Sequence, residues 1–354
     1  MRHVRALMLG ISLFALVIAC GGYVILSEIR APAAAAGDPV EFIVEPGASA
    51  GEIATALKAE GLIRQPALFT LLARSQGLEN KLQAGRFILS PTMTMSQILI
   101  ALQNSRMAEV QVTIPEGTRL EEIAAILEAA GVAGAADFLA VARDGERFRE
   151  EFFLLSSMPE GASLEGYLFP DTYRFPQQAR PEEVIRAMLT RFVEQYAAIE
   201  RGVQVPGATV HDLVTMASIV QREAARLDEM PLIAGVFWNR LKPEYAPIVG
   251  GALGSDATVQ YAAGYSAAEG AWWRKTLTDE DLRIASPYNT RLNPGLPPGP
   301  IAAPGLAALK AAAQPDTAAG YLFFVASCAR DGSHNFAAAY EEFQRYEAEW
   351  LACQ

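Results

Sequence analysis

Cysteine and histidine are scarce in this sequence, and their scarcity excludes several kinds of site. Only three of the 354 residues are cysteine and three are histidine. Neither type shows zinc-ligand spacing, and no Gly-rich phosphate loop occurs, so we expect no metal and no organic cofactor. Cys20, Cys328 and Cys353 are too few for a disulfide framework. Cys328 and Cys353 could pair in an oxidising compartment, although free thiols are favoured.

Positive charge is also in deficit. The chain has 29 lysines and arginines against 40 aspartates and glutamates, which gives a net charge of -11. A nucleic-acid partner would require a basic patch, so this class of function is excluded. A composition of 51% hydrophobic and 19% charged residues is instead typical of a globular protein, here of two or three domains.

One uncharged apolar run, from Ala6 to Leu26, is long enough to cross a bilayer as a helix. Arg2 and Arg5 precede it, so the positive-inside rule places the N-terminus in the cytoplasm and the rest of the chain outside. In the alternative, "VIAC" is a lipobox-like signal and Cys20 becomes a lipid-bearing N-terminus. The uncleaved anchor is favoured because the apolar run continues past Cys20. Both interpretations predict a membrane-tethered, extracytoplasmic protein.

The pattern of strands, helices and turns divides the chain into four parts and predicts the α+β class. Residues 1–30 form the anchor and residues 31–39 an Ala/Pro linker. Residues 40–109 form a small α/β module. Residues 110–354 form a larger mixed domain, with a helical segment at about 135–200 and a C-terminal strand or hairpin.

A strand–turn–helix pattern occurs twice. "VEFIVEPGASAGEIATALKAEGL", from Val40, parallels "VQVTIPEGTRLEEIAAILEAAGV", from Val110. Two similar units in tandem favour a binding module. The pattern is also common in unrelated proteins, so the sequence leaves both interpretations open.

The stretch "LVTMASIVQREAARLDEM" predicts an amphipathic helix, which we expect from Thr209 to Leu227. Glu223 falls only about 20° beyond the edge of its apolar stripe. Partial burial would raise the pKa of this carboxyl group, as a general acid requires. Alternatively, Glu223 is a boundary residue paired with a neighbouring arginine. The stripe comprises Leu213, Met216, Ala217, Val220, Ala224 and Leu227, and the residues that point away from it are Arg222, Arg226 and Glu229.

Further candidates lie in turn-rich segments. Glu165 and Asp171 bracket "GYLFP", and Asp256 lies in "GGALGSDATVQY", although turn or helix capping would also explain the two aspartates. The long Pro/Gly-rich loop at 286–304 exceeds the usual loop length, which favours a functional role. Aromatic residues could stack on sugar rings, although core positions are favoured; they are Tyr167, Phe169, Tyr173, Tyr261 and Tyr288.

Five motifs occur together in one order: "LEGYLFPDTY", "MASIVQREA", "SDATVQYA", "SPYNTRLNPGLPPGPIAAPGLAALKAA" and "YLFFVA…DGSHNF". In this order and spacing the chain resembles the endolytic murein transglycosylases, the YceG-like family. The resemblance covers nearly all of the chain beyond the anchor. It implies a LysM-like module at 40–109, a YceG-like catalytic domain at 110–354, and a single-pass protein of the bacterial plasma (inner) membrane.

The resemblance implies that Glu223 is the catalytic acid/base. Some members have glutamate where this chain has Gln221, and this departure favours Glu223 as the working residue. The chain also has "SDAT" in place of "SDPT", and an arginine in "NTRLNPG" where many members have an aromatic residue. The residues expected to bind substrate are Glu165, Tyr167, Asp256, Gln260, Tyr288, Asn289, Thr290 and His334.

The implied reaction is non-hydrolytic cleavage of the MurNAc-β-1,4-GlcNAc bond of peptidoglycan, which leaves 1,6-anhydroMurNAc ends. Expected partners are glycan strands, the membrane and cell-wall synthases. Two alternatives stay open. One is a lysozyme-like hydrolase that uses Glu223 with Asp256 or Glu165 as second carboxylate. The other is a non-catalytic peptidoglycan-binding scaffold.

Overall fold

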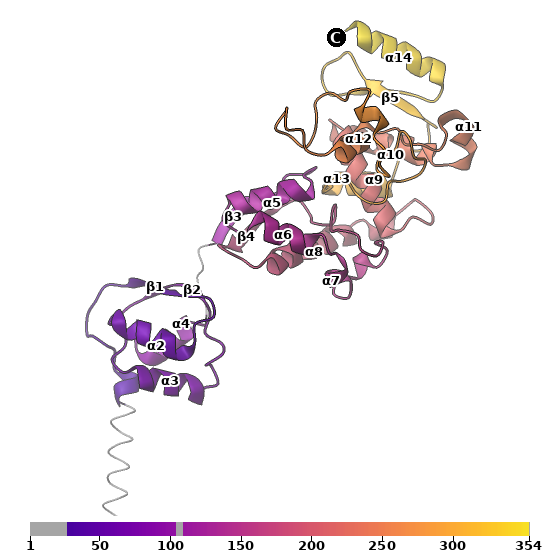
Figure 1. The fold of residues 1–354 in the computed structure, drawn as a ribbon. Helices are drawn as coiled ribbons and strands as arrows, with labels where there is room; N and C mark the ends of the chain where they lie inside the picture. The colour runs from indigo at the N-terminus through magenta and orange to yellow at the C-terminus, as the bar shows by residue number, and fades with distance from the viewer. Residues whose placement is uncertain (1–26, 104–108, 354) are drawn as a thin grey trace, which may run out of the picture. The chain divides into compact units, whose positions relative to one another are not determined.

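The computed structural model describes residues 27–103 and 109–353, which divide into two compact units (Figure 1). Unit 1 ends at Glu109 and unit 2 begins at Val110. The fold is α+β, with helices and two-stranded sheets in the described part of the chain. The predicted anchor, Ala6 to Leu26, lies outside the described residues. Within those residues no helix is both long and apolar enough to span a membrane.

Unit 1 packs helices against one face of an antiparallel sheet in which Phe42 lies opposite Phe87. Alternate strand residues are buried, and they join the helices in a single apolar core. Ser49 and Thr94 each cap a helix through a capping box. The elements are β1 (Val40–Val44), α2 (Ala50–Ala59), α3 (Pro66–Ser75), β2 (Gly85–Leu89) and α4 (Met95–Ala101).

The first half of unit 2 begins with the second strand–turn–helix, which confirms the predicted pattern at Val110. β3 pairs with β4, and the backbone N–H of Ile114 donates to the carbonyl of Asp171 beside this pair. The predicted helical segment is divided into several helices. The elements are β3 (Glu109–Thr113), α5 (Leu120–Ala129), α6 (Ala135–Ala142), α7 (Glu146–Arg149), β4 (Thr172–Pro176) and α8 (Pro181–Ala197).

The second half of unit 2 is built around α9 (Val210–Glu223), against which α10 and α13 pack. The loop at 286–304 contains no helix or strand, as predicted. The other elements are α10 (Met230–Arg240), α11 (Ala246–Val249), α12 (Asp256–Ala263), α13 (Leu306–Ala313), β5 (Phe323–Ala326), β6 (His334–Ala337) and α14 (Tyr340–Ala352).

α9 differs from its prediction in two respects. Every residue from Leu213 to Val220 is buried, because helices surround the predicted amphipathic helix on all sides. The helix also ends at Glu223 instead of Leu227, and Leu227 is exposed. The chain turns at Ala224 and allows Arg226 to pair with Asp331 of the β5–β6 connection. Tertiary contacts therefore override the helical propensity of this segment.

The C-terminal hairpin is joined covalently to α14. Cys328 and Cys353 form a disulfide, so the expectation of free thiols was wrong. The sequence did not suggest α14, which contacts β5 through partly buried Phe343 and Tyr346. None of its thirteen residues is fully buried. The disulfide therefore reinforces a helix that has little apolar packing of its own.

Replacing Cys328 and Cys353 by serine together is expected to lower the free energy of unfolding by up to about 3 kcal/mol. The physical reason is that the bond closes a loop with a sequence separation of 25 and so restricts the unfolded chain. Thermal unfolding without reductant measures the loss, with Cys20→Ser as the control that keeps the bond. Equal melting temperatures for the double variant and the control would contradict the role of the disulfide.

Candidate active site

Glu223 is the last residue of α9, and its carboxylate lies at the N-terminus of α12. Its Oε1 atom accepts hydrogen bonds from the Ser255 hydroxyl at 2.5 Å and from the backbone N–H of Ala257 at 3.4 Å. Ser255 is the N-cap residue of α12. A helix N-terminus carries a partial positive charge, so this position attracts an anionic group. The side chain is thus fixed by two donors from a second helix.

Burial raises the pKa of Glu223 above its usual range, although the hydrogen bonds from Ser255 and Ala257 oppose this effect. The negative charge of Asp256 also raises this pKa, whereas His334 lowers it. Desolvation is the largest of these effects because it penalises the charged carboxylate. Glu223 therefore keeps its proton to a higher pH than an exposed glutamate does.

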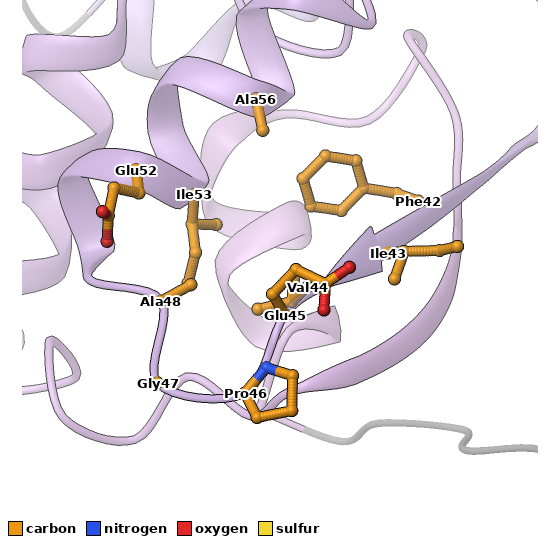
Figure 2. A pocket seen from close by; sticks show the side chains of 10 residues that line it. All are labelled: Phe42, Ile43, Val44, Glu45, Pro46, Gly47, Ala48, Glu52, Ile53 and Ala56. Atoms are coloured by element: carbon orange, nitrogen blue, oxygen red, sulfur yellow. The ribbon is translucent and has the colours of Figure 1, made fainter.

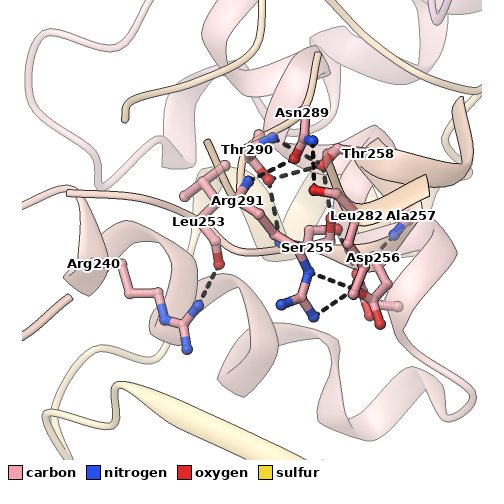
Figure 3. Close-up of polar contacts among 11 residues, drawn as sticks. Arg240, Leu253, Ser255, Asp256, Ala257, Thr258, Leu282, Asn289, Thr290 and Arg291 are labelled. Atoms are coloured by element: carbon pink, nitrogen blue, oxygen red, sulfur yellow. Dashed lines mark hydrogen bonds and ion pairs between the residues drawn. The ribbon is translucent and has the colours of Figure 1, made fainter. Parts of the chain in front are cut away.

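The segment that carries Ser255 is held from behind by Thr290 and Thr258 (Figure 3). The N–H of Ser255 donates to the Thr290 hydroxyl at 3.1 Å, and the Thr258 hydroxyl donates to the Ser255 carbonyl at 2.7 Å. Gly254 has a φ of +67°, which favours glycine, and its N–H donates to the Thr290 carbonyl. This network fixes the hydroxyl that contacts Glu223.

Asn289 and Thr290, both predicted to bind sugar, are buried and form part of this network. The Asn289 amide donates to the carbonyls of Leu282 and Ile284, and its oxygen accepts from the N–H of Arg291. Their polar atoms are thus occupied by the protein. Both residues position the loop in the structure and do not face the cleft described below.

A cleft of about 410 Å³ opens at Glu223. Ser255 and Asp256 line it beside Glu223, and an aromatic wall faces them. The wall was not predicted as part of the site, because its residues lie far along the chain from the motif that contains Glu223. The wall is formed by β5 and α14 through Phe323, Phe324, Tyr340 and Phe343.

Two arginines also line the cleft, and neither was predicted as a site residue. Arg291 pairs with Asp256 through Nε at 2.8 Å and Nη2 at 2.6 Å. Arg240 donates from Nε to the Leu322 carbonyl at 2.6 Å and from Nη1 to the Leu253 carbonyl. These arginines are recognised as site residues only because the fold brings them to the same cleft, since each lies in a different segment of the sequence.

Glu165 and Tyr167 lie outside the lining of this cleft. Both carboxylate oxygens of Glu165 accept from the N–H of Leu120, at 3.1 Å each, so Glu165 caps α5. Burial raises its pKa to about 7. Tyr167 is fully buried, and its hydroxyl is 2.9 Å from Nδ1 of His211. Both residues contribute to the framework of unit 2.

Gln260 and Tyr288, the other two predicted contacts near α12, also lie outside the lining of the cleft. Gln260 donates from Nε2 to the Arg274 carbonyl at 2.6 Å. Tyr288 packs on Tyr261, with ring centroids 4.8 Å apart. The structure thus brings Asp256 to Glu223 and places the remaining α12 and loop residues around them as support.

His334 begins β6 and contacts Glu229. Its Nδ1 atom is 2.7 Å from Oε2 of Glu229, and its backbone N–H donates to Oε1 at 3.0 Å. Glu229 was expected to be exposed, but only 12% of its side chain is accessible. The bend at Ala224 explains the difference, because the helical projection does not extend beyond Glu223.

Two neighbours of Glu223 on α9 face other segments. Gln221 accepts the N–H of Gly305 at 2.9 Å and so anchors the start of α13. Arg222, expected to point to solvent, is half-buried, with its guanidinium 3.9 Å from the centroid of the Trp273 ring. Among these three residues only Glu223 lines the cleft. In residues 27–103 and 109–353, no group of three or more His, Cys, Asp or Glu residues could hold a metal ion.

The chain is similar to several known proteins. It is 30% identical to an endolytic murein transglycosylase of Streptococcus pneumoniae (strain D39) over 98% of this chain, and 33% identical to one of Bacillus subtilis over 81% of this chain. It spans 65% of the streptococcal protein and 78% of the Bacillus protein.

A crystal structure of a YceG-like protein from Listeria monocytogenes matches with a TM-score of 0.57 and 29% identity. The match covers 88% of this chain and 99% of the Listeria chain. The YceG-like family model matches residues 42–349, which extend over parts of both units and include every residue of the cleft. The chain therefore belongs to the YceG-like family.

Proposed function

We propose that this protein is an endolytic lytic transglycosylase that cleaves the MurNAc-β-1,4-GlcNAc bond of peptidoglycan without water. The observation that carries the proposal is the half-buried Glu223, which has a raised pKa and lines an open cleft. The names of the streptococcal and Bacillus relatives support the same activity. A carboxyl group that keeps its proton near neutral pH is suited to general acid catalysis.

The geometry of Glu223 supports an order of proton transfers. Oε1 accepts both hydrogen bonds from Ser255 and Ala257, which leaves Oε2 to carry the proton. That proton passes to the glycosidic oxygen as its bond to the muramoyl anomeric carbon breaks. The C6 hydroxyl of the same muramoyl residue attacks this carbon and gives its proton to Glu223. The 1,6-anhydro ring closes, and Glu223 returns to its protonated state.

An intramolecular nucleophile removes the need for a second catalytic carboxylate, which a glycoside hydrolase normally uses. Asp256 lies in the cleft, but its carboxylate is paired with Arg291. The hydrolase alternative, with Asp256 as base, differs in its product, which has reducing ends heavier by one water.

We further propose that the Ala6–Leu26 run anchors the protein in the bacterial inner membrane, with both units outside the cytoplasm. The Cys328–Cys353 disulfide supports an oxidising location. In this location the protein would act on nascent strands made by neighbouring cell-wall synthases.

Unit 1 is proposed to bind glycan as a LysM-like module. A groove of about 400 Å³ between β1 and α2 supports this role (Figure 2). It combines apolar Phe42 and Ile53 with the carboxylates of Glu45 and Glu52. Apolar surfaces with a few polar groups are typical of ligand sites.

Glu223→Gln is expected to reduce glycan cleavage by about 10²- to 10⁴-fold, because glutamine cannot donate the proton. Mass spectrometry of the muropeptides measures the products, which for the unmodified protein should end in anhydro sugars. Exposed Glu183→Gln on α8 is the matched control. Products with only reducing ends would contradict the transglycosylase proposal, and full activity of Glu223→Gln would contradict the role of Glu223.

The folding of Glu223→Gln should be intact. The folded-state pKa of Glu223 is raised, so the fold loses stability as the pH rises from the unfolded-state pKa through the folded-state pKa. Removing the charge should therefore raise the melting temperature at alkaline pH, and the difference should diminish as the pH falls. Thermal melts from pH 4 to pH 9 provide the measurement, and a lower melting temperature at alkaline pH would contradict this sign.

Ser255→Ala is expected to move the alkaline limb of the kcat/KM profile to higher pH. The Ser255 hydroxyl stabilises the charged form of Glu223, so its removal raises the pKa of Glu223 further. The active enzyme has a protonated Glu223, so kcat/KM would begin to fall at a higher pH. Ser255→Thr, which keeps the hydroxyl, is the control. An alkaline limb that stays in place or moves to lower pH would argue against this assignment.

A further inference from the structure

A second pocket of about 320 Å³ adjoins the cleft and shares part of its lining. Arg240, Gly254 and Arg291 line both spaces, together with Phe323 and Tyr340. The two arginines are the only charged residues in the lining of the second pocket. This pocket is thus cationic, in a chain whose net charge is -11.

The charge of Arg240 has no carboxylate partner among the described residues. Its Nε and Nη1 atoms donate to the carbonyls of Leu322 and Leu253, which orient the side chain without neutralising it. Burial, followed by repulsion from Arg291, lowers its pKa to about 10, and the charge of Glu223 opposes this effect, so Arg240 stays charged near neutral pH. An oriented guanidinium without an ion-pair partner is a binding group for an anion.

Arg291 lines both the cleft and the second pocket. Its Nε and Nη2 atoms both contact a single oxygen of Asp256, Oδ1, so the pairing is not a two-oxygen fork. The side chain remains 41% exposed. Figure 3 shows the Asp256–Arg291 contact and Arg240 around the same loop.

The rest of the lining suits a group that is partly apolar. Ile248, Val249 and Ala252 supply aliphatic surface next to the guanidinium groups. The hydroxyl and acetamido groups of the sugars carry no charge, whereas the peptide attached to the lactyl group of muramic acid combines aliphatic side chains with carboxylates. Guanidinium groups bind carboxylates through short, charge-assisted hydrogen bonds.

We propose that Arg240 and Arg291 form a subsite for a carboxylate of the lactyl-peptide substituent carried by a muramic acid residue near the cleaved bond. This inference rests on the proposed function, since it assumes a peptidoglycan strand in the cleft. The subsite selects strands by their charge and sets the register of the strand relative to Glu223. Neutral glycans therefore lack one of the contacts that hold the substrate.

The test compares native peptidoglycan with peptidoglycan whose carboxylates have been converted to methylamides. Binding is measured by co-sedimentation with the full chain carrying Glu223→Gln, so that the readout does not require cleavage. Neutralised material should bind about tenfold more weakly, the factor expected for one charge-assisted hydrogen bond. Adding Arg291→Gln should reduce this ratio towards one.

Asp256→Asn is the matched control, because it removes the same ion pair but keeps the guanidinium of Arg291. Its ratio of native to neutralised binding should equal or exceed that of the parent. Arg291→Lys, which keeps the positive charge, should restore part of the ratio. These comparisons separate loss of the subsite from loss of the loop structure, and a thermal melt of each variant checks its folding.

Equal binding of native and neutralised material, or an unchanged ratio in Arg291→Gln, would overturn the subsite. Strands stripped of peptide by an amidase lose the peptide carboxylates and expose a lactyl carboxylate, which is amide-bonded in native strands. Binding as weak as that of neutralised strands shows that the subsite takes a peptide carboxylate, and binding like that of native strands shows that it also accepts the lactyl carboxylate. Parallel cleavage assays with the unmodified protein separate the two proposals, because absence of anhydro products overturns only the proposed activity.

Discussion

The chemistry of the cleft depends on the contact between the Glu223 carboxyl group and the N-terminus of α12. Burial alone would keep the carboxyl group neutral at all relevant pH values, and a helix terminus alone would keep it charged. The Ser255 hydroxyl and the Ala257 amide hold it between these limits. A group that must give and then regain a proton requires this balance, since both of its charge states occur in each cycle.

The balance depends on rigid surroundings. α9 is buried from Leu213 to Val220, so the backbone that carries Glu223 has little freedom to move. On the other side, Thr258 and Thr290 fix Ser255 through hydrogen bonds that are themselves buried. Buried and fully paired polar networks are costly to disrupt. Thr258 and Thr290 thus maintain the position of Ser255 relative to Glu223.

Sequence patterns were sufficient for local structure and for the position of Glu223. The repeated strand–turn–helix pattern at Val40 and Val110 predicted strands and helices that the structure contains. These features depend on neighbours within a few residues. The flank position of Glu223 on α9 is a local feature of the same kind.

Features that depend on distant segments could not be predicted in this way. Ser255 was not singled out in the sequence, and its hydroxyl contacts Glu223 because the N-terminus of α12 lies at the end of α9. Asn289 was expected to contact the sugar, but its side-chain amide donates its hydrogen bonds to two backbone carbonyls. The role of Arg240 follows only from the convergence of α10 with the loop that carries Arg291. Neither the hydrophobic periodicity of a segment nor the spacing of its motifs indicates which distant segments lie next to it.

The disulfide has a consequence for how the two sides of the cleft are held. α14 supplies Tyr340 and Phe343 to the aromatic wall, and partial apolar packing and the Cys328–Cys353 bond hold it there. The wall opposite Glu223 therefore depends on a covalent bond near the C-terminus, whereas the side that carries Glu223 depends on the buried core around α9.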